Sequence, residues 1–189
     1  MKIAALYDIH GNFPALNAVL EELEVLKLDI IIVGGDIVSG PMPVQTLNSL
    51  FHLCKKIQIR FIRGNGDREV AKASKGNKLL YLSEKGSEIQ HWVSKQLTSS
   101  QLDFLASLPD KTEVHSGTLG NISTPDSNKE IFTPATLMTR LKTIFKDTNQ
   151  QIVVCGHTHM QFKKQIEKLS VRNAGSVQST SPSLITSAF

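Results

Sequence analysis

The sequence has few cysteines and no long hydrophobic run. Its two cysteines, Cys54 and Cys155, lie far apart, one on a predicted helix and the other inside a predicted buried strand, so we expect no structural disulfide. The first apolar run, Lys2 to Tyr7, ends at Asp8 after a few residues. It is therefore too short for a signal-peptide core or a transmembrane helix, and we expect a cytoplasmic protein.

The sequence also lacks a cluster of basic residues, an internal repeat and a linker. The formal net charge of +4 is spread over the chain, which excludes the Lys/Arg stripe typical of a nucleic-acid footprint. This modest basic excess is compatible with a small phosphorylated substrate. With 189 residues and 40% hydrophobic residues, the chain is predicted to form a single domain, residues 1–189, with a proper core.

Alternating strand and helix patterns in the first third of the chain predict an α/β fold. Apolar runs predict strands at 2–7, 30–35 and 57–62, and another follows at 151–155. Between the first two strands, Asn12 and Pro14 are suited to begin a helix, and leucines and valines then recur at helical spacing. Such a strand–helix–strand order is typical of parallel sheets.

The rest of the chain is less regular. Residues 68–109 have no strand pattern and are predicted to form a helical excursion of two amphipathic helices. The remaining expectations are a short strand at 112–115, a loop at 116–129, a helix beginning at Thr133-Pro134, and strands at 161–166 and 169–173. The Ser/Thr-rich tail, residues 178–189, gives no firm prediction.

Polar side chains suited to metal ions follow four of the predicted strands. These residues are Asp8 and His10 after the first strand, Asp36 after the second, Asn65 after the third, and His157 and His159 after the strand at 151–155. In an open α/β sheet, ligands bind in the crevice beyond the carboxyl ends of the strands. The sequence therefore predicts a metal site where these loops converge.

Taken in order, these motifs resemble the calcineurin-like metallophosphoesterase family. They are Asp8-x-His10, Gly35-Asp36, Gly64-Asn65-Gly66-Asp67, an isolated His115 and Gly156-His157-Thr158-His159. The likeness is greatest to the small bacterial and archaeal phosphodiesterases of the family and extends from residue 1 to about Val177. Gly-Asp alone is common in turns, whereas two imidazoles directly after a buried strand are a much more specific signal.

The resemblance implies a four-layer fold, in which two mixed β-sheets pack as a sandwich flanked by helices. It also implies two divalent cations. One would be held by Asp8, His10, Asp36 and His159, and the other by Asp36, Asn65, His115 and His157, so that Asp36 bridges them. Mixed carboxylate, amide and imidazole ligands without a thiolate suit Mn²⁺, with iron, nickel and zinc as alternatives.

The family chemistry is hydrolysis of phosphoesters, with a hydroxide between the two cations as nucleophile. Phosphodiesters or nucleotide phosphoanhydrides are the expected substrates. Asn65, and with a weaker case Asn12, would contact the phosphate.

The sequence departs from the family pattern at Gly66, where many members have a histidine that protonates the leaving group or stabilises the transition state. This change predicts substrates with good leaving groups, because general acid catalysis typically contributes about 10²- to 10⁴-fold. Asp67 would then be left to pair with Arg68 or with a ligand histidine. The segment His115-Ser116-Gly117-Thr118 matches its motif only loosely, which predicts weaker binding of the second cation.

The chain ends soon after Val177, where the family normally continues with strands of the second sheet. We therefore expect either an incomplete sandwich, or a missing edge that is supplied by another chain in a homo-oligomer or left open.

Two other functions compete with the phosphodiesterase hypothesis. One is a non-catalytic binding scaffold of the same fold, like the related subunit of the retromer coat, and the other is a protein phosphatase. The presence of all seven expected metal ligands favours an enzyme over a scaffold. The absence of the histidine at Gly66 disfavours a protein phosphatase, because phosphoserine is a poor leaving group.

Overall fold

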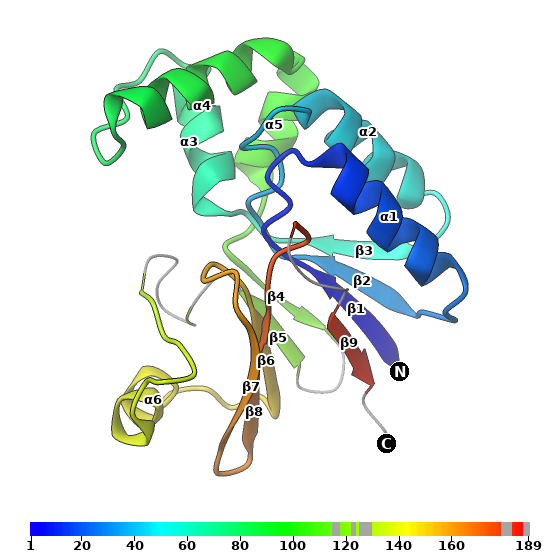
Figure 1. Ribbon diagram of the computed structural model, residues 1–189, viewed down its shortest axis with the longest axis vertical. Coiled ribbons are helices and arrows are strands. Elements are labelled where there is room, and N and C mark those ends of the chain that lie inside the picture. Colours follow the sequence, from blue (N-terminus) through cyan, green and yellow to red (C-terminus); the bar gives the residue numbers. More distant parts are fainter. Residues whose placement is uncertain (115–117, 122–123, 125–129, 179–182, 187–189) are drawn as a thin grey trace.

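Two β-sheets form the centre of the computed structural model, which describes residues 1–114, 118–121, 124, 130–178 and 183–186 (Figure 1). Sheet A has the order β3-β2-β1-β9, comprising β1 (Lys2–Leu6), β2 (Ile30–Val33), β3 (Gln58–Phe61) and β9 (Ser183–Thr186). Its first three strands are parallel and β9 is antiparallel to β1. Sheet B has the order β4-β5-β6-β8-β7, comprising β4 (Lys111–Val114), β5 (Thr118–Asn121), β6 (Ile152–Cys155), β7 (Gln161–Ile166) and β8 (Leu169–Ala174). Both sheets are mixed, as predicted.

Helices lie outside the two sheets, most of them beside sheet A or beyond the ends of its strands (Figure 1). On the side of sheet A they are α1 (Phe13–Glu24), α2 (Pro43–Leu53), α3 (Asn65–Ala73), α4 (Glu84–Gln96) and α5 (Ser99–Ser107). The short helix α6 (Met138–Ile144) lies beside sheet B. The four predicted layers are therefore present.

Three apolar layers hold this arrangement together. On β1, alternate residues point to opposite faces, so Ala4 and Leu6 pack toward the helices while Ile3 and Ala5 pack between the sheets. This double burial explains why β2 is apolar along its whole length and β1 is apolar after the exposed Lys2. A third cluster, including Leu141 of α6, covers the outer face of sheet B.

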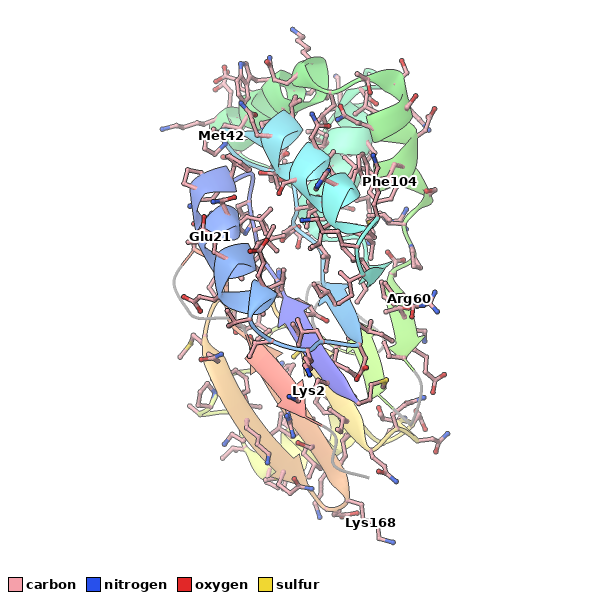
Figure 2. The ribbon with its side chains drawn as sticks, turned by 90° about the vertical axis from the view of Figure 1, so that its right-hand side faces the viewer. Lys2, Glu21, Met42, Arg60, Phe104 and Lys168 are labelled. Atoms are coloured by element: carbon pink, nitrogen blue, oxygen red, sulfur yellow. The ribbon has the colours of Figure 1, made fainter. Side chains whose placement is uncertain are left out.

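Charged side chains such as Glu21, Arg60 and Lys168 lie on the outside of the molecule (Figure 2). Cys54 is exposed, Cys155 is buried, and both are free thiols, as expected. Among the helices in the described ranges, none is long and apolar enough to cross a membrane.

Several predicted elements need correction. The excursion at 68–109 contains three helices rather than two, because α3 begins at Asn65, inside the ligand motif. The predicted loop at 116–129 contains β5, whose Gly120 and Asn121 are poor strand formers; pairing with β4 on one side and β6 on the other stabilises this strand.

The helix expected from Thr133 begins only at Met138. Before it, Thr133 and Thr136 bond to each other's backbone: the Thr133 N–H donates to Thr136 Oγ1 at 2.8 Å, and the Thr136 N–H donates to the Thr133 carbonyl at 3.0 Å. These local bonds form a turn in place of a first helical turn.

The end of the chain also differs from the expectation. The last strand, β9, extends sheet A beside β1. The sequence had instead raised the question of missing strands in the second sheet, sheet B. The second sheet has β4 and β7 as its edge strands.

Candidate metal centre

The loops that follow β1 and β2 are joined by backbone hydrogen bonds. Because the two strands are parallel and in register, they end at the same level. The N–H groups of Asp8, His10 and Gly11 donate to the carbonyls of Gly35, Asp36 and Ile37, at 3.2, 2.8 and 2.8 Å. The predicted ligands of the first two motifs are thereby brought side by side.

Five of the predicted ligands have left-handed backbone conformations. The φ angles are 52° for Asp8, 51° for His10, 48° for Asp36, 73° for His157 and 55° for His159. Among the described non-glycine residues, Glu167 in the β7–β8 turn is the one other case. Such conformations cost about 1–3 kcal/mol each and concentrate at functional sites.

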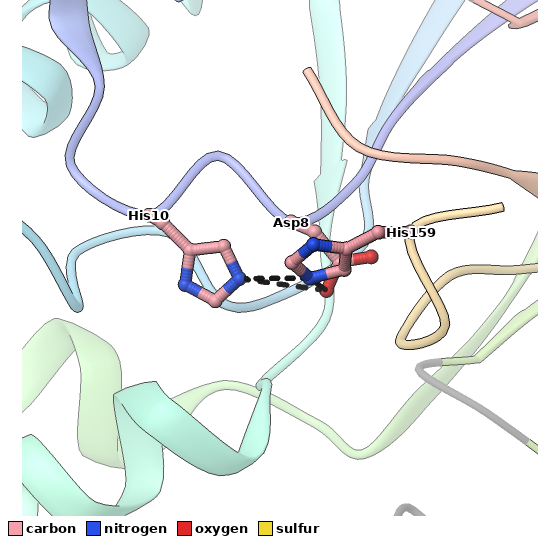
Figure 3. A group of neighbouring side chains, drawn as sticks. All are labelled: Asp8, His10 and His159. Atoms are coloured by element: carbon pink, nitrogen blue, oxygen red, sulfur yellow. Dashed lines mark hydrogen bonds and ion pairs between the residues drawn. The ribbon is translucent and has the colours of Figure 1, made fainter. Parts of the chain in front are cut away.

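Three side chains from two loops that are distant in sequence meet at the centre of the site (Figure 3). Nε2 of His10 lies 3.2 Å from Nε2 of His159, and these two nitrogens lie 4.0 and 3.7 Å from Asp8 Oδ1. In the described part of the chain, this is the one group of three or more His, Cys, Asp or Glu side chains arranged closely enough to hold a metal ion.

The geometry of this group fits a divalent cation. The point equidistant from the three atoms lies about 2.1 Å from each, which is the length of a typical bond from Zn²⁺ to nitrogen or oxygen. Asp8 Oδ1 is fully buried and has no hydrogen-bond partner within the described structure. An unpaired carboxylate oxygen that faces two imidazole nitrogens suits a cation better than it suits any protein donor nearby.

The protonation of the cluster follows from its burial. Burial, reinforced by the charges of Asp36 and Asp67, raises the pKa of Asp8 to about 8, although a hydrogen bond from the His157 N–H opposes this. Burial lowers the pKa of His10, His157 and His159. The imidazoles are therefore neutral at pH 7, which is the form that binds metal ions.

Of the other predicted ligands, Asp36 and His157 lie beside this group. Asp36 is 3% exposed, and its Oδ1 accepts a 2.6 Å hydrogen bond from the Gly66 N–H. The His157 N–H donates to Asp8 Oδ2 at 2.7 Å. Asn65 is the first residue of α3, while His115 lies outside the described residues.

The second predicted phosphate contact, Asn12, has a structural task. Its Oδ1 accepts a 3.1 Å hydrogen bond from the Ala15 N–H and so caps α1, as its position before Pro14 predicts. Its role toward a phosphate stays a prediction.

The sequence predicted that Asp67 pairs with Arg68 or with a ligand histidine, and this prediction is wrong. Its carboxylate is fully buried and accepts hydrogen bonds from the backbone N–H groups of Ile37, Val38 and Gly64, at 2.8, 3.2 and 3.0 Å. It therefore ties α3 to the loop that carries Asp36. Arg68 binds Asp110 instead, at 3.0 Å.

A side chain at Gly66 would have to displace the side chain of Ser39. A Cβ there would lie 2.2 Å from Ser39 Oγ and 3.0 Å from Asp36 Oδ1. The Ser39 hydroxyl in turn donates to Gln90 Oε1 of α4 at 3.1 Å. Ser39 was not identified from sequence because no motif marks it.

The calcineurin-like phosphoesterase superfamily domain matches residues 1–188, and the chain therefore belongs to this family, whose members depend on metal ions. Over 109 residues it is 34% identical to an uncharacterised protein of Methanocaldococcus jannaschii, a match that spans 57% of this chain and only 42% of that protein.

Solved structures share the fold. A hypothetical protein from Pyrococcus horikoshii OT3 has a TM-score of 0.84 at 18% identity, over 97% of this chain and 86% of that one. A metallophosphoesterase from Sphaerobacter thermophilus has a TM-score of 0.72 at 22% identity, over 94% of this chain and 77% of that one. The family and fold predicted from the motifs are thus confirmed.

Proposed function

We propose that this chain is a metal-dependent phosphoesterase that hydrolyses phosphodiesters or nucleotide phosphoanhydrides. The observation that carries the proposal is Asp8 Oδ1, a buried and unpaired oxygen that faces the ring nitrogens of His10 and His159. A buried acceptor without a partner costs about 1–3 kcal/mol, and a bound cation relieves this cost.

The proposal assigns each predicted ligand to one of two divalent cations. Asp8, His10, Asp36 and His159 would hold one cation, and Asp36, Asn65, His115 and His157 would hold a second. Divalent cations supply an activated water and neutralise charge on the phosphoryl oxygens. The donor set favours Mn²⁺, with iron, nickel or zinc as alternatives.

The substrate class follows from Gly66. Because Ser39 Oγ occupies the space beside it, no histidine can protonate the leaving group from this position in the native packing. The reaction then depends on leaving groups that depart as stable anions, such as a nucleotide, a phosphate or an aryl oxide.

The test is hydrolysis of bis-p-nitrophenyl phosphate by metal-stripped protein with Mn²⁺ added back. We expect turnover that requires the metal and falls by about 10³-fold in Asp36→Asn and His159→Ala, because several kcal/mol of charge stabilisation are lost. His52→Ala is the matched control, since His52 is exposed on α2 and outside the site. Folded protein without turnover under any divalent metal would overturn the proposal in favour of a non-catalytic scaffold.

A second experiment tests the substrate class. We expect wild-type protein to prefer aryl and anhydride substrates over phosphoserine peptides, and preferential turnover of the peptides would indicate a protein phosphatase. Gly66→His must be combined with Ser39→Gly, because the single variant forces its Cβ against Ser39. A double variant that gains activity only toward poor leaving groups would support the role assigned to Gly66.

A further inference from the structure

A polar side chain at the end of β8 holds the loop that carries two of the ligands. Asn173 is 1% exposed, and its Nδ2 donates to the Gly156 carbonyl at 2.8 Å and to Thr158 Oγ1 at 3.0 Å. Its Oδ1 accepts from the Gly175 N–H at 3.0 Å. Both amide hydrogens and the amide oxygen are thus engaged, and two of the three bonds go to the segment 156–159.

This segment has a backbone that needs such support. His157 and His159 both have positive φ, on either side of Thr158. Between them the Thr158 N–H turns back to the Gly156 carbonyl at 2.9 Å, so this carbonyl accepts from both Thr158 and Asn173. Strained conformations persist only where surrounding contacts over-determine them, and Asn173 provides two such contacts from outside the ligand set.

The residues that follow Asn173 reach the opposite ligand loop. Ser176 Oγ donates to the Asp8 carbonyl at 2.8 Å, and the Val177 N–H donates to the Tyr7 carbonyl at 3.0 Å. Figure 1 shows this segment, in orange-red, running from the end of β8 toward sheet A. One segment, residues 173–177, therefore contacts the loop of Asp8 and His10 as well as the loop of His157 and His159.

We propose that Asn173 is a positioning residue for metal binding: its side-chain amide holds residues 156–159 in the left-handed geometry that aims His159 at Asp8 and His10. This inference deepens the proposed function, since it concerns the same metal centre. In addition, Asn173 is proposed to organise residues 156–159 in the metal-free protein, before a cation binds.

The principal test compares Asn173→Ala with Val171→Ala. Val171 is a fully buried residue of the same strand that packs in the apolar cluster beside α6, so its truncation serves as a control for general loss of stability. We expect Asn173→Ala to weaken Mn²⁺ binding by about 10- to 100-fold, as removal of groups that orient metal ligands typically does, and Val171→Ala to leave it within about 2-fold. Isothermal titration calorimetry on metal-stripped protein measures both.

A second readout needs no metal. Amide hydrogen exchange at residues 156–159 of metal-stripped protein is expected to accelerate in Asn173→Ala relative to Val171→Ala. Should Asn173→Ala fail to fold, Thr158→Val removes one of the two contacts while Thr158→Ser retains it. We expect weaker Mn²⁺ binding in the valine variant and near wild-type binding in the serine variant.

Wild-type Mn²⁺ affinity in both Asn173→Ala and Thr158→Val would overturn the inference and leave Asn173 a purely structural residue. Weakened binding in these variants, in protein whose wild type binds Mn²⁺ yet hydrolyses no phosphoester, would support the positioning role while the proposed function failed.

Discussion

Asp8 and Asp67 are both fully buried carboxylates in adjoining loops, yet their oxygens have opposite surroundings. Asp67 accepts three backbone hydrogen bonds, from Ile37, Val38 and Gly64. Asp8 accepts one, from His157, and its second oxygen has no partner in the described structure. Burial raises the pKa of both groups, and the neighbouring charge of Asp36 adds to the effect.

The two aspartates show two uses of a buried carboxylate, a group whose burial costs free energy. Asp67 accepts hydrogen bonds from three backbone N–H groups through its two oxygens, so its carboxylate serves the structure. Asp8 is left short of donors beside two neutral imidazoles, so its unpaired oxygen makes sense only with a ligand. The same residue type therefore anchors a loop at one site and binds a cation at the other.

The largest expected effect is on activity and belongs to Asp8. Asp8→Asn keeps the size of the side chain but removes the charge, so kcat/KM for bis-p-nitrophenyl phosphate with Mn²⁺ should fall by about 10³-fold or more. The metal-stripped variant should be no less stable than wild type, because a buried carboxyl has been replaced by a neutral amide. Steady-state kinetics and urea unfolding measure the two effects. A variant that lost stability and retained activity would reverse the roles assigned to the two aspartates.

Asp67 should show the opposite pattern. Asp67→Ala leaves three buried N–H groups unpaired and should lower the free energy of unfolding of metal-stripped protein by about 3–5 kcal/mol. Asp67→Asn keeps an oxygen for Ile37 and Val38 and should cost less. Urea unfolding followed by circular dichroism gives both values, and equal losses in the two variants would contradict the role of the backbone bonds.

The pH dependence of stability sharpens the comparison further. In the unfolded chain Asp8 loses its proton near pH 3.8, whereas in the metal-free fold it keeps the proton until about pH 8. The unfolded state therefore binds fewer protons in this window, and metal-stripped protein should become less stable as the pH rises through it, by at most about 1.4 kcal/mol per pH unit for this group.

Saturating Mn²⁺ should reverse that trend, because it binds the ionised carboxylate. Urea unfolding at several pH values between 5 and 8, with wild type and Asp8→Asn side by side, provides the measurement. An unchanged slope in metal-stripped Asp8→Asn would show that another group is responsible.

The smallest effect concerns the second buried oxygen that lacks a partner in the described structure, Thr46 Oγ1 on α2. No titratable side chain in the candidate site depends on it, so Thr46→Val should raise the free energy of unfolding by about 1 kcal/mol and leave kcat/KM unchanged. A loss of activity in this variant would mean that an unpaired buried oxygen alone does not distinguish a functional site here.

Patterns along the chain predicted the buried strands and the ligand loops, because apolar runs report burial on both faces of a strand and polar residues at strand ends report the crevice. The four layers were implied only by the resemblance to the family. Asp8, His10 and His159 were found in this way. Side-chain contacts between segments that are distant in sequence could not be predicted in this way, because no sequence pattern marks them. Nothing around Asn173 or Ser176 indicates that they reach Gly156 and Asp8, since this depends on how β8 lies beside β6 and β1.

Asp67 illustrates a second limit. The motif suggested Arg68 or a ligand histidine as its partner, but two of its donors are the backbone N–H groups of Ile37 and Val38, about thirty residues away. Backbone N–H groups are present at nearly every position, so a sequence cannot indicate which of them a buried carboxylate will meet. β5 was missed for a related reason, because its pairing on both edges outweighs a composition poor in strand formers.

The pairing of β9 with β1 has a consequence for biosynthesis. It joins Lys2 to Thr186, 184 positions apart in the sequence (186 − 2), so β1 leaves the ribosome long before the strand that pairs with this edge has been made. Until then the apolar strand β1 has an open edge, which other chains can use for pairing. A chain shortened before residue 183 would keep this edge open permanently, and we expect such a chain to aggregate during expression even though every proposed metal ligand is present.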